Sequence, residues 1–153
     1  MNILARGITL YKRILIPTDG STVAKRGAEH GVNLAASIGA EVHALYVIQE
    51  GSNPWLSESL ESQRERAEDY GEDIVGEVAD KAANAGVECI TEITAGPAVY
   101  EEINEYVEEN DIDAIVMGSG YKGTMGGLLG SVASKVIRTS DVPVISVRKG
   151  EVG

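Results

Sequence analysis

The sequence predicts an α/β domain in which a doubly wound parallel sheet carries helices on both faces. Five runs rich in strand-forming residues alternate with helical patterns along a chain of 153 residues, a length that suits one domain. The first, fourth and fifth runs are almost continuously apolar, which is typical of strands buried on both faces. Strict alternation of strand and helix predicts parallel strands joined by right-handed crossovers.

The expected strands are short and lie between turn-forming residues. They span residues 13–17, 41–48, 87–93, 114–117 and 143–147. Between the first two strands, alanine and valine recur at helical spacing from Ala24 to Ala36. Ser21 or Thr22 is a suitable N-cap for this first helix, and Gly39 is a suitable stop.

Three further helices are expected between the later strands. The second helix runs from residue 57 to residue 84, with an apolar stripe along it and Gly86 at its end. Pro97 suits the first turn of the third helix, because that position needs no backbone N–H, and Asn110 is a suitable stop. The fourth helix follows Gly130, with Ser131 as its N-cap, and ends before the last strand.

Composition and charge narrow the classes of function. The chain has 13 lysines and arginines against 24 aspartates and glutamates, a formal net charge of -11, so a nucleic-acid partner is not expected. No apolar run approaches the ~20 residues that cross a bilayer, and no signal-peptide pattern is present, which favours a cytoplasmic protein without a membrane partner. A single Cys89 can form neither a disulfide framework nor a cysteine zinc site. His30 and His43 are interpreted as surface or core residues.

A glycine-rich stretch over residues 118–131 carries the strongest functional signal. It places six glycines directly after an apolar run and directly before a helical pattern. At such a turn, free backbone N–H groups and the positive end of a helix dipole converge, which favours phosphate. Gly118, Gly120 and Gly130 let the backbone wrap a polyphosphate, and Ser131 and Val132 would complete the cradle. The alternative is a mobile loop whose glycines only make turns.

Asp19 follows the first expected strand, in the loop that precedes the first helix. Ligands of doubly wound folds bind at the carboxyl ends of the strands, where the strand order reverses. If the first and fourth strands flank that point, this loop and the glycine-rich loop become neighbours. There a carboxylate could accept hydrogen bonds from ribose hydroxyls or hold a divalent metal. The alternative is that Asp19, Gly20 and Ser21 only form a turn and helix cap. We interpret the irregular stretch 49–55 as a shield for the pocket.

Other catalytic and binding motifs are excluded or weak. A P-loop needs a Gly-Lys pair, and the chain has none. A Gly-x-Gly-x-x-Gly occurs at Gly118, Gly120 and Gly123, but it follows the fourth strand and lacks the downstream acidic residue, which leaves dinucleotide binding as a weak alternative. No nucleophile elbow is present, and no serine has a histidine and acid partner in the sequence, so a catalytic triad is not expected.

Several segments together resemble the universal stress protein family, in its ATP-binding branch. The likeness runs from Tyr11 to Lys149 and is carried by residues 13–21, 44–48, 96–97, 115–119, 129–132 and 142–147. The resemblance implies a five-stranded sheet in the order 3-2-1-4-5, of the adenine nucleotide alpha hydrolase-like type. It also implies a signature of Gly, two residues, Gly, nine residues, Gly, then Ser or Thr. Gly120 and Gly130 match its second part, whereas Gly118 and Gly120 enclose one residue instead of two.

The same resemblance implies a ligand, a site and an assembly. The ligand is ATP or AMP, with Mg²⁺ or Mn²⁺ held through the phosphates. The family pattern places adenine and ribose against Pro17, Thr18, Asp19 and Val47, and the phosphates against Met117, Gly118, Gly120, Gly130, Ser131 and Val132. A homodimer is expected through Val142, Pro143, Val144, Ile145, Ser146 and Val147, because an unpaired apolar edge invites aggregation.

These implications lead to a hypothesis on organisation and function. Residues 1–10 are expected to form an N-terminal extension, residues 11–149 the universal stress protein domain and residues 150–153 a C-terminal tail. The leading hypothesis is a cytoplasmic, homodimeric stress-response protein that binds ATP or AMP and changes its surface or stability with nucleotide state. Two alternatives stay open: a nucleotide-free dimeric interaction protein, which the shortened loop makes credible, and a slow ATP hydrolase, for which no general base is evident.

Overall fold

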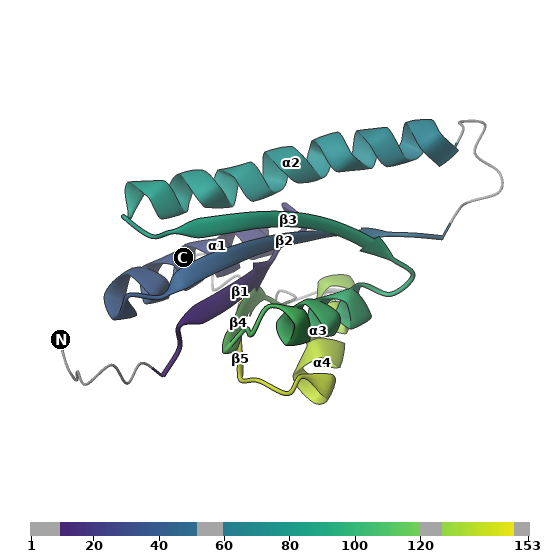
Figure 1. The fold of residues 1–153 in the computed structure, drawn as a ribbon. Coiled ribbons are helices and arrows are strands. Elements are labelled where there is room, and N and C mark those ends of the chain that lie inside the picture. Colours follow the sequence, from purple (N-terminus) through teal and green to yellow (C-terminus); the bar gives the residue numbers. More distant parts are fainter. Residues whose placement is uncertain (1–9, 52–59, 120–126, 149–153) are drawn as a thin grey trace, which may run out of the picture.

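The computed structural model describes residues 10–51, 60–119 and 127–148. Within them, parallel strands form one sheet in the order β3-β2-β1-β4-β5 (Figure 1). The strands are β1 (Arg13–Pro17), β2 (Glu41–Gln49), β3 (Cys89–Gly96), β4 (Ala114–Gly118) and β5 (Val144–Val147). The helices are α1 (Thr22–Ile38), α2 (Leu60–Asn84), α3 (Val99–Glu109) and α4 (Gly127–Thr139). The predicted fold class and strand order are confirmed, whereas the expected extension, apart from Leu10, and the tail 150–153 lie outside the described residues.

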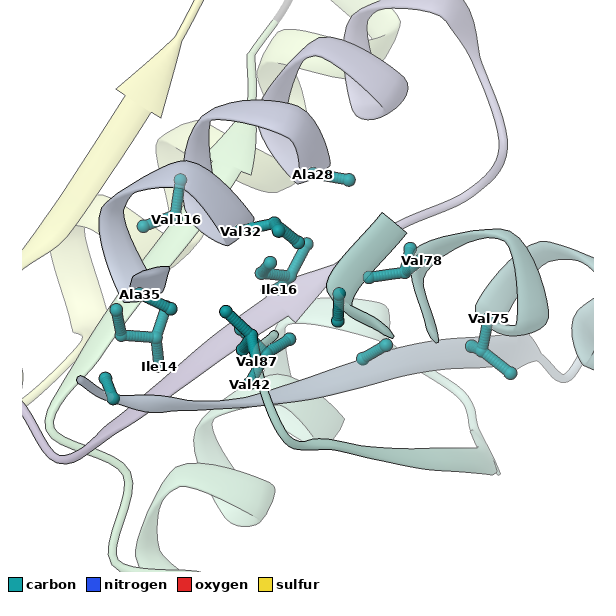
Figure 2. Packing of buried hydrophobic residues seen from close by; sticks show 13 residues of the cluster. Ile14, Ile16, Ala28, Val32, Ala35, Val42, Val75, Val78, Val87 and Val116 are labelled. Atoms are coloured by element: carbon teal, nitrogen blue, oxygen red, sulfur yellow. The ribbon is translucent and has the colours of Figure 1, made fainter. Parts of the chain in front are cut away.

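Each face of the sheet carries its own pair of helices. Side chains of a strand alternate between the two faces, so Ile14 and Ile16 of β1 pack with α1 and α2, whereas Leu15 packs with α3 and α4. Figure 2 shows the first layer, where Val32 of α1 lies beside Ile16. Burial of each such side chain contributes roughly 1.5–3 kcal/mol, which fixes the helices on the sheet. Within the described residues, no helix is both long and apolar enough to cross a membrane.

The ends of α1 follow from local signals in the sequence. Ser21 is the N-cap, and its hydroxyl oxygen accepts a hydrogen bond from the backbone N–H of Ala24 at 3.2 Å. Of the two predicted candidates, Ser21 rather than Thr22 therefore caps the helix. Gly39 ends α1 in the left-handed conformation, at a φ of 76°, and its N–H donates to the carbonyl of Ala35.

The starts of α3 and α4 differ from the prediction. Pro97 precedes α3, whose N-cap is Ala98. The carbonyl of Pro97 accepts a hydrogen bond from the Gln49 side chain at 3.4 Å. Because Ala98 has extended backbone angles, φ -134° and ψ 122°, the helix begins only after it, and Pro97 lies outside the first turn. α4 begins at Gly127, so Ser131 lies inside the helix and is not its N-cap. A glycine costs only about 1 kcal/mol in a helix, which packing can outweigh. The start of α2 predicted at residue 57 lies outside the described residues.

β3 and β5 also depart from the prediction. β3 begins and ends later than expected, because it pairs with β2 continuously from Val42 opposite Cys89 to Gln49 opposite Gly96. β5 is an edge strand, which pairs with β4 on one side only among the described residues, and it is not buried on both faces as expected. Its apolar residues are half-buried and Ser146 is exposed. The central strands β1 and β4 are buried as predicted.

His43 is a buried core residue with a partner on each ring nitrogen. Its Nδ1 lies 2.7 Å from the hydroxyl oxygen of Tyr106 in α3, and its Nε2 lies 2.8 Å from a carboxylate oxygen of Glu41. A neutral imidazole satisfies both contacts if Nε2–H donates to Glu41 and Nδ1 accepts from Tyr106. The interpretation of His43 as a packing residue is therefore confirmed, and His30 is exposed on α1.

Candidate functional site

The strand order reverses at the centre of the sheet, between β1 and β4. β1 pairs with β2 on one side and with β4 on the other. After β1 the chain continues to α1 on one face of the sheet, and the helix that follows β4 lies on the opposite face. The carboxyl ends of these two strands therefore flank a crevice of the kind in which open α/β sheets bind their ligands.

The turn after β1 is held by its own polar side chains. The N–H of Thr18 donates to the carbonyl of Leu45 at 2.9 Å, which ties the turn to β2. The hydroxyl of Thr18 accepts the N–H of Gly20 at 3.2 Å, and the carboxylate of Asp19 accepts the N–H of Ser21 at 2.9 Å. Gly20 has a φ of +81°, which suits glycine. The turn and the helix cap are therefore present, and the exposed carboxylate of Asp19 also lies at the crevice.

Glycine lets α1 approach the end of β4 at backbone distance. A Cβ on Gly118 would lie 2.2 Å from the carbonyl oxygen of Val23, and one on Gly27 would lie 2.5 Å from the backbone nitrogen of Gly118. Real Cβ atoms do not make such contacts, so neither position tolerates a side chain without movement of the backbone. This contact places the β1–α1 turn beside β4.

A cavity of about 310 Å³ occupies the crevice. Its walls combine apolar side chains from both helix layers with the polar turn after β1. The described lining residues are Pro17, Thr18, Asp19, Ser21, Val23, Ala24, Leu45, Tyr46, Val47, Gln49, Val99, Ile103, Met117, Gly118 and Val132. A mostly apolar cleft with a few polar groups at one end is typical of sites for small organic ligands.

The cavity contains most of the predicted site residues. Those in the lining are Pro17, Thr18, Asp19, Val47, Met117, Gly118 and Val132. Gly120 lies outside the described residues. Gly130 and Ser131 are described but do not line the cavity. Gly130 is the fourth residue of α4, and the N–H at that position donates to the N-cap carbonyl, as that of Lys25 does in α1, so neither Gly130 nor Ser131 offers a free N–H.

Helix α2 supplies a neighbour of the cavity that sequence reasoning did not identify. Tyr70 of α2 stacks edge-on against the cavity residue Tyr46, with ring centroids 5.8 Å apart, and its hydroxyl donates to the carbonyl of Asp19 at 3.4 Å. Gly71 makes this approach possible, because a Cβ there would lie 2.5 Å from the ring of Tyr46. Burial, with smaller effects of Tyr70 and Asp19, raises the pKa of Tyr46. The sequence feature that could have indicated this contact is Gly71, a glycine inside an otherwise helical run.

The cavity offers one carboxylate and no cationic side chain among the described residues. Asp19 is the only charged residue in the described lining. No group of three or more potential metal ligands occurs in the described part of the chain. An anionic ligand at this site would therefore depend on backbone N–H groups or on a metal that the ligand itself helps to hold.

Comparison with known proteins identifies the family. The family model described as "Universal stress protein family" matches residues 10–148. The chain belongs to the universal stress protein family. Universal stress protein MJ0531 of Methanocaldococcus jannaschii is 39% identical over 97% of this chain and 88% of that protein. The solved structure of MJ0577 from the same organism has a TM-score of 0.80 at 28% identity, covering 94% of this chain and 100% of that one. A universal stress protein solved in complex with cAMP has a TM-score of 0.74 at 24% identity, covering 93% of this chain and 100% of that one.

In this universal stress protein, the glycines of the expected signature differ in their surroundings. Gly118 packs against the backbone of α1, which by itself accounts for the absence of a side chain. At Gly130, by contrast, no described atom beyond its chain neighbours and the nearby backbone of its own helix lies within 4 Å of the position that a Cβ would take. Packing within the described residues therefore explains the first glycine and leaves the second available for contact with another group.

Proposed function

We propose that this universal stress protein binds an adenine nucleotide, ATP or AMP, in the cavity at the carboxyl ends of β1 and β4, and that it acts as a homodimeric regulatory module. The observation that carries the proposal is the cavity at the switch point of the sheet, where β2 extends past the end of β1. The complex of a similar universal stress protein with cAMP supports an adenine nucleotide as the ligand.

Val47 supplies a donor and an acceptor that suit adenine. The register of β1 with β2 ends at Pro17 opposite Leu45, and the N–H of Thr18 still donates to the carbonyl of Leu45. Peptide groups alternate along a strand, so those of Val47 face the same side as those of Leu45. Among the described residues no strand lies opposite Val47 on that side. Its N–H and carbonyl match the ring nitrogen and the amino group on the edge of adenine.

Asp19 is placed to hold the ribose. One of its oxygens accepts the N–H of Ser21, and its carboxylate borders the cavity. A carboxylate has about four acceptor positions, so it can also accept two hydroxyl groups. Apolar side chains from α3 and α4, Val99 and Val132, also line the cavity.

The phosphates are expected to extend toward the start of α4. The free N–H groups and the positive dipole end of this helix favour an anion there, and Gly130, the fourth residue of the helix, has no side chain to obstruct it. Gly120 and Ser131 remain part of the proposed phosphate contacts. Because the described lining holds no cation, Mg²⁺ or Mn²⁺ would be held mainly by phosphate oxygens, with Asp19 as the available protein carboxylate.

Calorimetric titration tests the proposal directly. AMP, and ATP with Mg²⁺, are expected to give saturable heats with the wild-type chain and to raise its unfolding temperature, because a ligand that binds only the folded state stabilises it. Titration with GMP under the same conditions measures the preference for adenine. If neither adenine nucleotide gives heat or a thermal shift, the proposal of nucleotide binding is wrong.

The Asp19→Asn variant is expected to weaken AMP binding about tenfold, because a neutral acceptor replaces a charged one at the ribose hydroxyls. Asparagine keeps an oxygen that accepts the N–H of Ser21, so the turn should persist. Titration calorimetry measures the affinity. Asp80→Asn, which removes the same charge from the exposed face of α2, is the control and should bind as wild type does. An unchanged affinity in Asp19→Asn would remove Asp19 from the ribose site.

The outer edge of β5, which pairs with no described strand, is proposed as the dimer interface. The carbonyls of Pro143 and Val147 accept hydrogen bonds from the β4 side, so the peptide groups of Val144 and Ser146 face outward. Ser146→Pro removes one outward N–H and is expected to weaken dimerisation about tenfold, as judged by sedimentation over a concentration series. Ser146→Ala is the matched control, because it also loses the hydroxyl contact with Ser119 but keeps the N–H. Equal association of the two variants would contradict this interface.

A further inference from the structure

The opposite edge of the sheet, β3, is also free among the described residues. β3 pairs with β2 over its whole length, and no described strand lies on its other side. The carbonyls of Glu88 and Gly96 accept hydrogen bonds from the β2 side, so the peptide groups of Thr91 and Ile93 face outward. An edge of eight residues is long enough to template a further strand.

A groove of about 270 Å³ runs between this edge and α3. Ile90, Glu92 and Thr94 lie on the face of β3 that α3 covers, because their partners in β2 are His43, Leu45 and Val47. The cover is incomplete, since Ile90 is 46% exposed. The groove therefore has an uncovered apolar residue beside it as well as polar walls. Its described lining residues are Glu92, Thr94, Glu102, Glu105, Tyr106, Glu109 and Asn110.

The groove carries an unbalanced negative charge. Glu102, Glu105 and Glu109 are spaced along one stripe of α3 and face Glu92 across the groove. No lysine or arginine is among the described lining residues, and none of these carboxylates takes part in the ion pairs that the described residues form. The negative charge of the groove also acts on Tyr106 in its wall. Burial is the main cause of the raised pKa of Tyr106, and the charge of Glu92 is the next.

We propose that the β3 edge and the groove beside it bind an extended segment of a partner protein that carries lysine or arginine at alternate positions. Such a segment would add a strand to β3, and alternate side chains would enter the groove. The methylene stem of a lysine can lie on Ile90 while its ammonium group meets the carboxylates. A second copy of this chain is disfavoured as the occupant, because its own β3 would bring like charges to the same face.

The test uses the full chain and a labelled nine-residue peptide that alternates lysine and valine. Fluorescence anisotropy at low ionic strength is expected to show saturable binding, and a peptide with glutamate in place of lysine is expected not to bind. The triple variant Glu92→Gln, Glu105→Gln, Glu109→Gln should weaken binding of the lysine peptide about tenfold. The control triple Glu65→Gln, Glu68→Gln, Glu72→Gln removes the same charge from α2 and should bind as wild type does.

Amide hydrogen exchange then tests the pairing itself. Because the N–H groups of Thr91 and Ile93 face outward, both should exchange more slowly when the lysine peptide is bound. Three results would overturn the proposal: no saturable binding of the lysine peptide, an equal loss of affinity in the two triple variants, or binding without slower exchange at Thr91 and Ile93. Thermal unfolding of each triple variant checks that the fold is retained.

Discussion

Replacing Gly118 with alanine is expected to lower the free energy of unfolding by about 3 kcal/mol, the upper part of the range for overpacking a core. The new Cβ would lie 2.2 Å from the carbonyl oxygen and 2.6 Å from the carbonyl carbon of Val23. Both are backbone atoms in the first turn of α1, so no rotation of a side chain relieves the overlap. α1 must then move away from β4, and the cavity beside Asp19 changes with it. Urea unfolding followed by circular dichroism measures the effect.

Gly76→Ala is the matched control for this substitution. Gly76 lies inside α2, and a Cβ there would meet nothing within 4 Å among the described residues. Alanine favours a helix over glycine by roughly 0.5–1 kcal/mol, so this variant should be more stable than wild type. The two substitutions add the same methyl group and should shift the unfolding midpoint in opposite directions. A Gly118→Ala midpoint equal to that of wild type would show that α1 and β4 are not in backbone contact.

Gly118 illustrates what the sequence leaves undecided. Its place after an apolar run and before other glycines indicates a phosphate-binding turn, and the structure puts it in the cavity lining. Its close contact, however, is with the backbone of Val23. No local pattern reports that contact, because the two residues are far apart in the sequence and the chain between them crosses the sheet. The sequence alone therefore does not distinguish a glycine that packing requires from a glycine that a ligand requires.

The features that local patterns control were predictable. Ile14, Leu15 and Ile16 all read as buried, and the structure assigns them to two different helix layers by simple alternation. Ser21 and Gly39 were sufficient to locate the ends of α1. The alternation of strands and helices was sufficient for the parallel sheet, and the family resemblance supplied the strand order.

The features that depend on packing between distant elements were not predictable. Val99 and Ile103 of α3 have the spacing of ordinary core residues, and only the fold shows that they also line the cavity. Tyr70 lies on a largely charged helix, where the sequence gives an exposed tyrosine no evident role. Only the fold shows that its hydroxyl reaches the carbonyl of Asp19. The start of α4 at Gly127 was missed because four residues with two glycines read as loop, although a packed helix tolerates them.

The Val47→Pro variant is expected to bind AMP about 30-fold more weakly than wild type, because loss of the N–H leaves the adenine ring nitrogen without a donor in a desolvated site. Proline is tolerated where a strand has no partner on the N–H side, and the N–H of Val47 faces the side on which β1 has already ended. The residue before a proline must be extended, and Tyr46 already lies in β2. The unfolding free energy of the unliganded variant should therefore change by less than about 1 kcal/mol.

Val47→Ala separates the peptide group from the side chain. Both variants lose the valine side chain that lines the cavity, but only proline removes the N–H. Alanine should cost a few-fold in affinity, because it buries less apolar surface against the base. Calorimetric titration of both variants with AMP gives the ratio of their dissociation constants, and urea unfolding shows whether the sheet is intact. If the two variants bind AMP equally while both remain folded, the base does not pair with the backbone of β2 and must be held elsewhere in the cavity.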